Sequence, residues 1–199
     1  MKKEDGVKLS KRTADGKIAY LIKPILKVLQ DAGGQLERSE IKERIVVVWL
    51  GGHALHWPHT REFNMRQDVA AARVVMGSEV PFVQLPCLGV VSSFRISGPE
   101  LEFWLKGKNA IAEYLAQNTI TAAERYAAKM AWTRCLWDVT AVAWLKNRGD
   151  RFLLSRLVPA PLPTYERQYE QRGDAAFMRY VYYVNRDELM NDLFSVVKA

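Results

Sequence analysis

Between Asn64 and Met76 the hydrophobic positions of the chain follow the spacing of an α-helix. Val69, Ala72 and Met76 recur at i, i+3 and i+7, which places them on one narrow apolar stripe. Asn64 has the chemistry of an N-cap, and Gln67, three residues later, can reach back to the cap's own N–H. The sequence therefore predicts one amphipathic helix over residues 64–76, with a polar face directed toward solvent.

Two runs rich in β-branched and aromatic residues follow this helix. Residues 82–85 and 90–96 are separated by Pro86, Cys87, Leu88 and Gly89, which favours a β-hairpin with a short connection. A helix followed at once by a hairpin is the order of the recognition helix and wing in a winged helix-turn-helix. We therefore expect residues 64–96 to be the functional centre of the protein.

The preceding residues supply the other helices that this fold requires. Hydrophobic positions at helical spacing predict one helix over residues 18–29 and a second that begins at Ser39 and continues through Trp49. Each is followed by a Gly-Gly pair that can end it. Residues 1–16 show no periodicity and are expected to form a flexible basic arm. We accordingly assign residues 17–107 to a winged-helix domain.

The second half of the chain is predicted to be a mostly helical domain over residues 108–199. Short helices over 99–106 and 109–117 are separated at Gly107, and Thr121 with Glu124 forms a capping box that opens a helix extending to Asn147. Its apolar positions include Tyr126, Met130, Trp137 and Trp144. Such an aromatic seam is covered either by residues 152–197 or by a second subunit. Residues 152–197 are the simpler cover, but a helix of this length exceeds the span of a small domain, so we expect part of the seam to remain for a second copy in a homodimer.

The last 50 residues or so contain weaker patterns. Residues 152–158 are a short apolar run, and the proline-rich stretch 159–163 must be extended. Residues 175–184 fit a strand or a helix, and their tyrosines favour a strand. Asn185 caps a final amphipathic helix. The expected fold class is thus mainly α with a small β-hairpin.

Charge and composition agree with a polyanionic partner. Lys and Arg number 29 against 22 Asp and Glu, which gives a net charge of +7 and a pI of 9.4, and the excess is spread over both halves. No apolar run is long enough to cross a membrane, and the first residues lack the pattern of a signal peptide. Cys87 and Cys135 form no recognisable motif. We therefore expect a cytoplasmic protein.

The side chains expected to contact DNA are mainly arginines. Arg66, Gln67 and Arg73 lie off the apolar stripe, and their bidentate geometry suits base edges in the major groove. Lys42 and Arg44 are expected on the DNA backbone, and Arg95 in the wing is expected on a phosphate or in the minor groove. The alternative is that all these residues belong to a solvated helix face. We interpret them as the DNA-binding residues.

All three histidines, His53, His56 and His59, lie within one short loop. Three imidazoles could fill three positions of a tetrahedral zinc site, with Glu62 or water as the fourth. Their spacing matches no familiar zinc motif, and Pro58 prevents a continuous helix through His59. We therefore expect no metal and no other cofactor. Because no supported catalytic constellation is present either, we expect a protein that is not an enzyme.

Four segments give the chain a resemblance to a known family. Tyr20–Leu29, Ser39–Ile45, Asp68–Val75 and Gly89–Gly98 are similar to segments of the N-terminal winged-helix domain of Mrr-type restriction endonucleases. The resemblance covers residues 18–107 and implies a DNA-binding domain. The separate nuclease domain of that family has no counterpart here, so nuclease activity is not implied.

Two functions are consistent with these observations. The first is a non-enzymatic, winged-helix protein that binds double-stranded DNA, as a transcription regulator or accessory factor in a defence or mobile-element setting. The alternative is an interaction subunit that uses its winged helix to bind a protein in a defence or counter-defence complex. Steep weakening of binding with salt would indicate phosphate contacts and so favour DNA.

Overall fold

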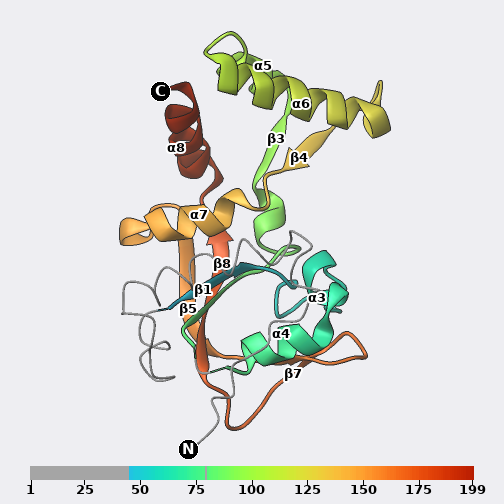
Figure 1. Ribbon diagram of the computed structural model, residues 1–199, viewed down its shortest axis with the longest axis vertical. Helices are drawn as coiled ribbons and strands as arrows, with labels where there is room; N and C mark the ends of the chain where they lie inside the picture. Colours follow the sequence, from blue (N-terminus) through green and yellow to red (C-terminus); the bar gives the residue numbers. More distant parts are fainter. Residues whose placement is uncertain (1–44, 79) are drawn as a thin grey trace, which may run out of the picture. The chain divides into compact units, whose positions relative to one another are not determined.

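The computed structural model describes residues 45–78 and 80–199, and residues Val47–Ala199 form one compact unit. Its centre is a four-stranded sheet in the order β1-β2-β8-β5. The strands are β1 (Val47–Leu50), β2 (Phe82–Leu85), β8 (Phe177–Val184) and β5 (Leu153–Pro159). Strands β1, β2 and β8 are parallel, whereas β5 is antiparallel to β8. The described unit is therefore an α/β structure built on a mixed sheet (Figure 1).

Two short helices connect the first pair of parallel strands. Helix α3 (Phe63–Gln67) and helix α4 (Val69–Met76) lie between β1 and β2 in the chain. Parallel neighbours cannot be joined by a tight turn, so a crossover of this kind is required. The segment from Val47 to Leu85 is thus a β-α-β unit.

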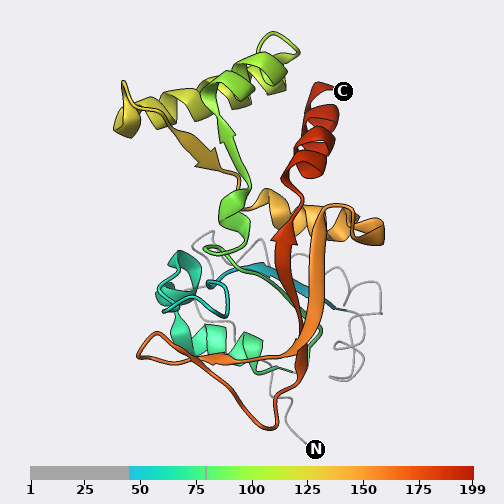
Figure 2. The same ribbon diagram turned by 180° about the vertical axis from the view of Figure 1, so that it is seen from behind.

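The remaining elements lie between β2 and β8 or follow β8. They are α5 (Gly98–Leu105), α6 (Ala110–Ala127), α7 (Val139–Lys146) and α8 (Arg186–Lys198), 3₁₀ turns at Val91–Ser93 and Arg148–Asp150, and the strand pairs β3 (Arg95–Ser97) with β4 (Thr133–Cys135) and β6 (Leu162–Pro163) with β7 (Tyr169–Glu170). Helix α5 packs against α6 and α8. The pair β3–β4 leads from the sheet region to α5 and α6 (Figure 2).

Hydrophobic side chains pack on both faces of the sheet. On one side Val83 and Val181 join a large cluster with Phe94 and with residues of α5 to α8. On the other side Phe82 and Tyr180 pack with residues of α3 and α4. Strands covered on both faces are typical of parallel sheets. This two-sided packing explains why every residue of β2 is buried.

The predicted fold class, mainly α with a winged helix-turn-helix, is wrong. The expected helix over 64–76 is divided at Asp68, whose extended backbone (φ −151°) interrupts the helical path. The Asp68 side chain then accepts from Ala71 N and caps α4. The N-cap of α3 is Glu62 rather than Asn64. There is no single recognition helix in this segment.

The predicted wing is also wrong. Residues 82–85 form an internal strand of the main sheet, where they pair with β1 on one side and β8 on the other. The second expected strand begins as the 3₁₀ turn Val91–Ser93, and only Arg95–Ser97 is extended, in a pair with β4. The two runs therefore join different sheets instead of pairing with one another.

Two further helices were predicted where the structure has other elements. The expected helix through Trp49 is a strand at Val47–Leu50. The expected helix over 121–147 is three elements, because α6 ends at Ala127 and is followed by β4 and α7. Tyr126 is 59% exposed and Met130 68% exposed, so they form no shared seam with Trp137 and Trp144. The argument for a homodimer therefore has no structural basis.

Several predictions are confirmed. Helices α5 and α6 are separated around Gly107, which has a positive φ of 70°. Residues 177–184 are a strand, and a final helix begins after Asn185.

The expected domain boundary at Gly107 lies inside the compact unit. The expected arm over 1–16, the helix over 18–29 and the start of the next helix lie outside the described residues. No helix among the described residues is long and apolar enough to cross a membrane.

Phe94 provides a test of the larger core. Its side chain is fully buried in that cluster, whereas Phe103 on α5 is 72% exposed. We expect Phe94→Ala to lower the free energy of unfolding by about 3 to 5 kcal/mol, because it removes buried surface and leaves a cavity. Phe103→Ala is the matched control and should cost less than about 1 kcal/mol. Urea unfolding followed by circular dichroism measures both, and equal losses would contradict this assignment of the core.

Candidate functional site

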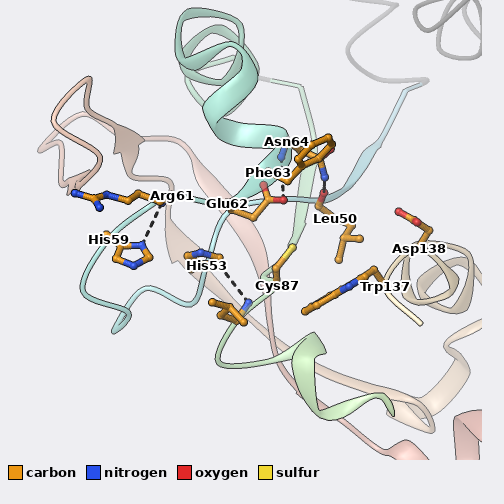
Figure 3. A pocket seen from close by; sticks show the side chains of 11 residues that line it. Leu50, His53, His59, Arg61, Glu62, Phe63, Asn64, Cys87, Trp137 and Asp138 are labelled. Atoms are coloured by element: carbon orange, nitrogen blue, oxygen red, sulfur yellow. Dashed lines mark hydrogen bonds between the residues drawn. The ribbon is translucent and has the colours of Figure 1, made fainter. Parts of the chain in front are cut away.

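A cavity of about 500 Å³ opens beside the carboxyl ends of the parallel strands β1 and β2 (Figure 3). Open α/β sheets bind their ligands outside this edge, where the loops after the strands converge. The walls come from the loop after β1, the start of α3, the loop after β2 and the start of α7. The lining residues are Leu50, His53, His59, Arg61, Glu62, Phe63, Asn64, Cys87, Leu88, Trp137 and Asp138.

Glu62 organises the wall of the cavity at the start of α3. Its Oε2 accepts hydrogen bonds from the backbone N–H of Gly52 at 3.0 Å and of Met65 at 2.9 Å. Its Oε1 accepts from Asn64 N at 2.9 Å. A carboxylate at a helix N-terminus satisfies otherwise unpaired N–H groups and interacts favourably with the helix dipole. Glu62 is only 5% exposed and therefore ties the loop after β1 to α3.

Gly52 is the other end of this connection. It has a positive φ of 71°, and an added Cβ would collide with the Tyr169 hydroxyl and the end of Met65. Its carbonyl oxygen accepts from Cys87 N at 2.8 Å, which joins the loops after β1 and β2. Only glycine meets both requirements, because other residues rarely adopt this backbone conformation and none has space for a side chain.

A buried polar chain supports the floor behind Gly52. Gln84 Nε2 donates to Gly51 O and to the Tyr169 hydroxyl, at 3.1 and 3.0 Å, and the Tyr169 hydroxyl donates to His53 O at 2.9 Å. Burial raises the pKa of Tyr169 well above its usual value, so the hydroxyl keeps its proton and acts as a donor. Gln84 Oε1 has no partner among the described residues.

His53 lies in the cavity wall as a neutral imidazole. Burial lowers its pKa below 6.5, with the nearby Glu62 opposing the shift and His59 adding to it. Its Nδ1 accepts from Leu88 N at 3.3 Å, so the proton of the neutral ring resides on Nε2. His59 lies next to it, with ring centroids 5.4 Å apart, and its own Nδ1 accepts from Arg61 N.

Cys87 faces the cavity but is not a ready nucleophile. Burial raises the pKa of its thiol far above the usual value, and the carboxylate of Glu62 raises it further. The thiolate is the reactive form of cysteine. The Cys87 side chain therefore contributes a small, neutral surface.

Four other side chains can meet a ligand. Asn64 Nδ2 donates to Leu50 O at 3.1 Å, which holds the amide in place and leaves its oxygen free to accept. Asp138, at the N-cap of α7, makes no side-chain cap bond and no ion pair within the described part of the chain. Phe63 and Trp137 add aromatic surface. A carboxylate, a fixed amide and aromatic rings together suit a small polar ligand with a flat apolar part.

The histidines predicted as weak metal candidates are only partly brought together. His53 and His59 are neighbours, whereas His56 does not line the cavity and contacts Trp57 at a centroid distance of 6.5 Å. Within residues 45–78 and 80–199, no three His, Cys, Asp or Glu side chains gather in a group that could hold a metal ion.

The residues predicted to bind DNA lie in several places. Arg66 lies over the Phe63 ring, and Gln67 is the last, exposed residue of α3. Arg73 Nη1 donates to Pro163 O, and Arg95 donates to Thr133. Lys42 and Arg44 lie outside the described residues. The helix and wing that were to place these side chains on DNA are absent, and their contact with any ligand stays a prediction.

The most informative site residues were overlooked in the sequence. The sequence suggests Glu62 only as a fourth zinc ligand, Asn64 only as a helix cap and Trp137 only as part of a helical seam, and it indicates no role for Asp138. One indication of the site is that Glu62, Phe63 and Asn64 follow the apolar run that ends at Gly51 and Gly52, separated from it by the histidine loop. In a β-α-β unit such polar residues follow the carboxyl end of a strand.

Comparison with known proteins identifies the fold. No protein-family model matches the chain, and no curated protein matches it either. Among solved structures it is similar to a plant nucleoside hydrolase, with a TM-score of 0.61 and 15% identity over 77% of this chain and 54% of the other. An inosine-guanosine nucleoside hydrolase gives 0.61 and 13% over 81% and 56%. An inosine-uridine preferring nucleoside hydrolase from Bacillus anthracis gives 0.58 and 20% over 84% and 56%.

These similarities show the fold, and the chain spans just over half the length of each of these structures. They overturn the resemblance to the winged-helix domain of Mrr-type endonucleases, since the sheet has parallel strands. The assignment as a non-enzymatic DNA-binding regulator, with double-stranded DNA and a second copy as partners, is wrong for the same reason. The alternative of a winged helix that binds a protein has no better support.

Glu62→Gln tests the role of the buried carboxylate. The amide keeps one acceptor oxygen but turns an NH₂ group toward backbone N–H donors. We expect the free energy of unfolding to fall by about 2 kcal/mol or more, because hydrogen bonds to a charged acceptor are lost in a buried place. Glu124→Gln, an exposed residue of α6, is the matched control. If chemical unfolding shows equal stability for both variants, Glu62 does not hold the loop.

His53 gives a pH test. Its pKa is lower in the folded chain than in the unfolded chain, so the unfolded state binds the proton more readily. Protonation of His53 therefore favours the unfolded state as the pH falls below about 6.5, and His53 has no such effect on the free energy of unfolding above that value. Between pH 7.5 and 5.5 the free energy of unfolding of His53→Gln should therefore fall less than that of the wild type. His56→Gln, in the same loop but exposed, should retain the wild-type profile, and identical profiles for both variants would contradict the assignment.

Proposed function

We propose that the cavity binds a nucleoside and that the protein hydrolyses its N-glycosidic bond. The observation that carries the proposal is the position of Asp138 and Asn64 in a cavity at the carboxyl edge of parallel strands. The fold similarity to nucleoside hydrolases supports the same substrate class. The proposal thus combines a cavity whose polar groups suit a nucleoside with a fold that solved nucleoside hydrolases share.

The start of α3 is the proposed binding surface for the sugar. The Asn64 amide is held by its bond to Leu50 O, so its oxygen can accept a hydrogen bond from a sugar hydroxyl without losing much side-chain freedom. Phe63, which is 63% exposed beside it, can contact the apolar edge of the sugar. Preorganised polar groups of this kind lower the entropic cost of binding.

Asp138 is the proposed general base. It lines the cavity, and no cation among the described residues neutralises it. It can take a proton from a water molecule as the water oxygen forms a bond to the sugar carbon C1′. The C1′–N bond breaks as the C1′–O bond forms, and its electron pair leaves with the base, whose nitrogen takes a proton from solvent while Asp138 returns its own proton to solvent. The products are a free sugar and a free base.

The proposal includes a cytoplasmic location. It is supported by two unpaired cysteines, Cys87 and Cys135, which are both buried. Free thiols are most common in proteins of reducing compartments.

Two substitutions test binding and chemistry separately. We expect Asp138→Asn to slow the release of base from inosine or uridine at least about 100-fold, because the amide cannot accept the proton from water. We expect Asn64→Leu to weaken nucleoside binding about tenfold, because one hydrogen bond to the sugar is lost. Chromatography of the released base measures the rate, and titration calorimetry measures the affinity.

Asp150→Asn is the matched control for Asp138, because Asp150 is exposed in a 3₁₀ turn and lines neither described cavity. It should leave rate and affinity unchanged. Failure of the full wild-type chain to bind inosine or uridine would refute the proposed function. Binding without any release of base would keep the ligand class and refute the hydrolytic step.

A further inference from the structure

A second cavity adjoins the first. It has a volume of about 410 Å³ and lies between α6 and the segment that connects β4 to α7. Trp137 and Asp138 line both cavities, so this pair forms a common wall. The other lining residues are Asn118, Thr119, Ala122, Arg134, Cys135, Leu136 and Val139. Two adjoining cavities suit a ligand such as a nucleoside, whose sugar and base are joined by a single bond.

The two spaces differ in their chemistry. The first presents the Asn64 amide and several polar groups around the start of α3. The second has apolar surface from Ala122, Leu136 and Val139, the polar side chains of Asn118 and Thr119, and one guanidinium, that of Arg134. A flat ring can meet apolar surface on its faces there and the guanidinium of Arg134 at its edge.

Arg134 is held in position without a charged partner. Its Nη1 donates to the Tyr126 hydroxyl at 3.1 Å, and its guanidinium lies 5.9 Å from the centroid of the Tyr126 ring. It forms no ion pair with a carboxylate in the described part of the chain. The Nε and Nη2 groups make no hydrogen bond within that part either. A planar donor pair of this kind binds two adjacent acceptors in one plane.

We propose that the second cavity holds the base of the nucleoside and that Arg134 selects a 6-oxopurine. This inference rests on the proposed function. The bond to be cleaved then lies at the common wall, beside Asp138. Oxygen O6 and nitrogen N7 of hypoxanthine or guanine are adjacent acceptors that match the guanidinium. Adenine presents an amino group in place of O6, so a donor faces a donor, and uracil has no N7.

The test measures binding of the full chain to free bases and to nucleosides. Hypoxanthine and adenine differ at the edge that Arg134 contacts and are not substrates for hydrolysis, so calorimetry reports the base site alone. We expect hypoxanthine to bind roughly tenfold or more tightly than adenine, and inosine to exceed adenosine by a similar factor. Replacing N7 by carbon, in 7-deazainosine, should remove part of that preference.

Three variants complete the experiment. Arg134→Met should bring the ratio of hypoxanthine to adenine affinity close to one, and Arg134→Lys should give an intermediate ratio because ammonium lacks the planar donor pair. Arg125→Met, at an exposed position of α6 that lines neither cavity, should retain the wild-type ratio. Circular dichroism confirms that each variant is folded.

The outcomes separate this inference from the proposed function. Equal affinity of the wild-type chain for inosine and adenosine, or an unchanged preference in folded Arg134→Met, would overturn the role of Arg134 and leave nucleoside binding intact. Absence of nucleoside binding would overturn both. Loss of preference in Arg134→Met together with its retention in Arg125→Met supports the assignment.

Discussion

The site depends on one buried carboxylate. Glu62 binds three backbone N–H groups, those of Gly52, Asn64 and Met65. Through Gly52, whose carbonyl accepts from Cys87 N, the same connection reaches the loop after β2. An unpaired N–H group in this buried place would cost more free energy than a typical hydrogen bond contributes. The carboxylate therefore fixes where α3 begins, and with it the positions of Phe63 and Asn64 at the cavity.

The amino-acid sequence allowed part of the fold to be predicted, and the reason for the main error is physical. A helix followed by an apolar run occurs both in a winged helix and in a β-α-β unit. The two differ in the partners of the second strand, and those of Phe82–Leu85 are Val47–Leu50 and part of β8, far away in the chain. Local periodicity contains no information about such pairing. The absence of alternation in Phe-Val-Gln-Leu was the one local sign of a strand buried on both faces.

The candidate site was predictable only in fragments. The loop with His53 and His59 stands out in the sequence, but the pattern only raises and rejects a metal site there and does not predict that the loop forms the wall of a cavity. Asp138 was missed since Trp137 was placed on a long helix that does not exist. In the structure a non-helical segment including Thr133–Cys135 separates α6 from α7. That break brings Trp137 and Asp138 to the cavity wall, and it follows from tertiary contacts that a single sequence does not reveal.

The physical state of each polar group in the cavity narrows the possible chemistry. Glu62 is occupied by three backbone donors, and the thiol of Cys87 keeps its proton because burial raises its pKa. His53 is neutral and uses Nδ1 to hold Leu88 N. Glu, Cys and His are common catalytic residue types, but here Glu62 and His53 bind backbone N–H groups of the cavity wall and Cys87 packs in that wall as a neutral thiol. Among the described residues that line the cavity, Asp138 is the carboxylate left available, and we therefore place the proposed hydrolytic step on it.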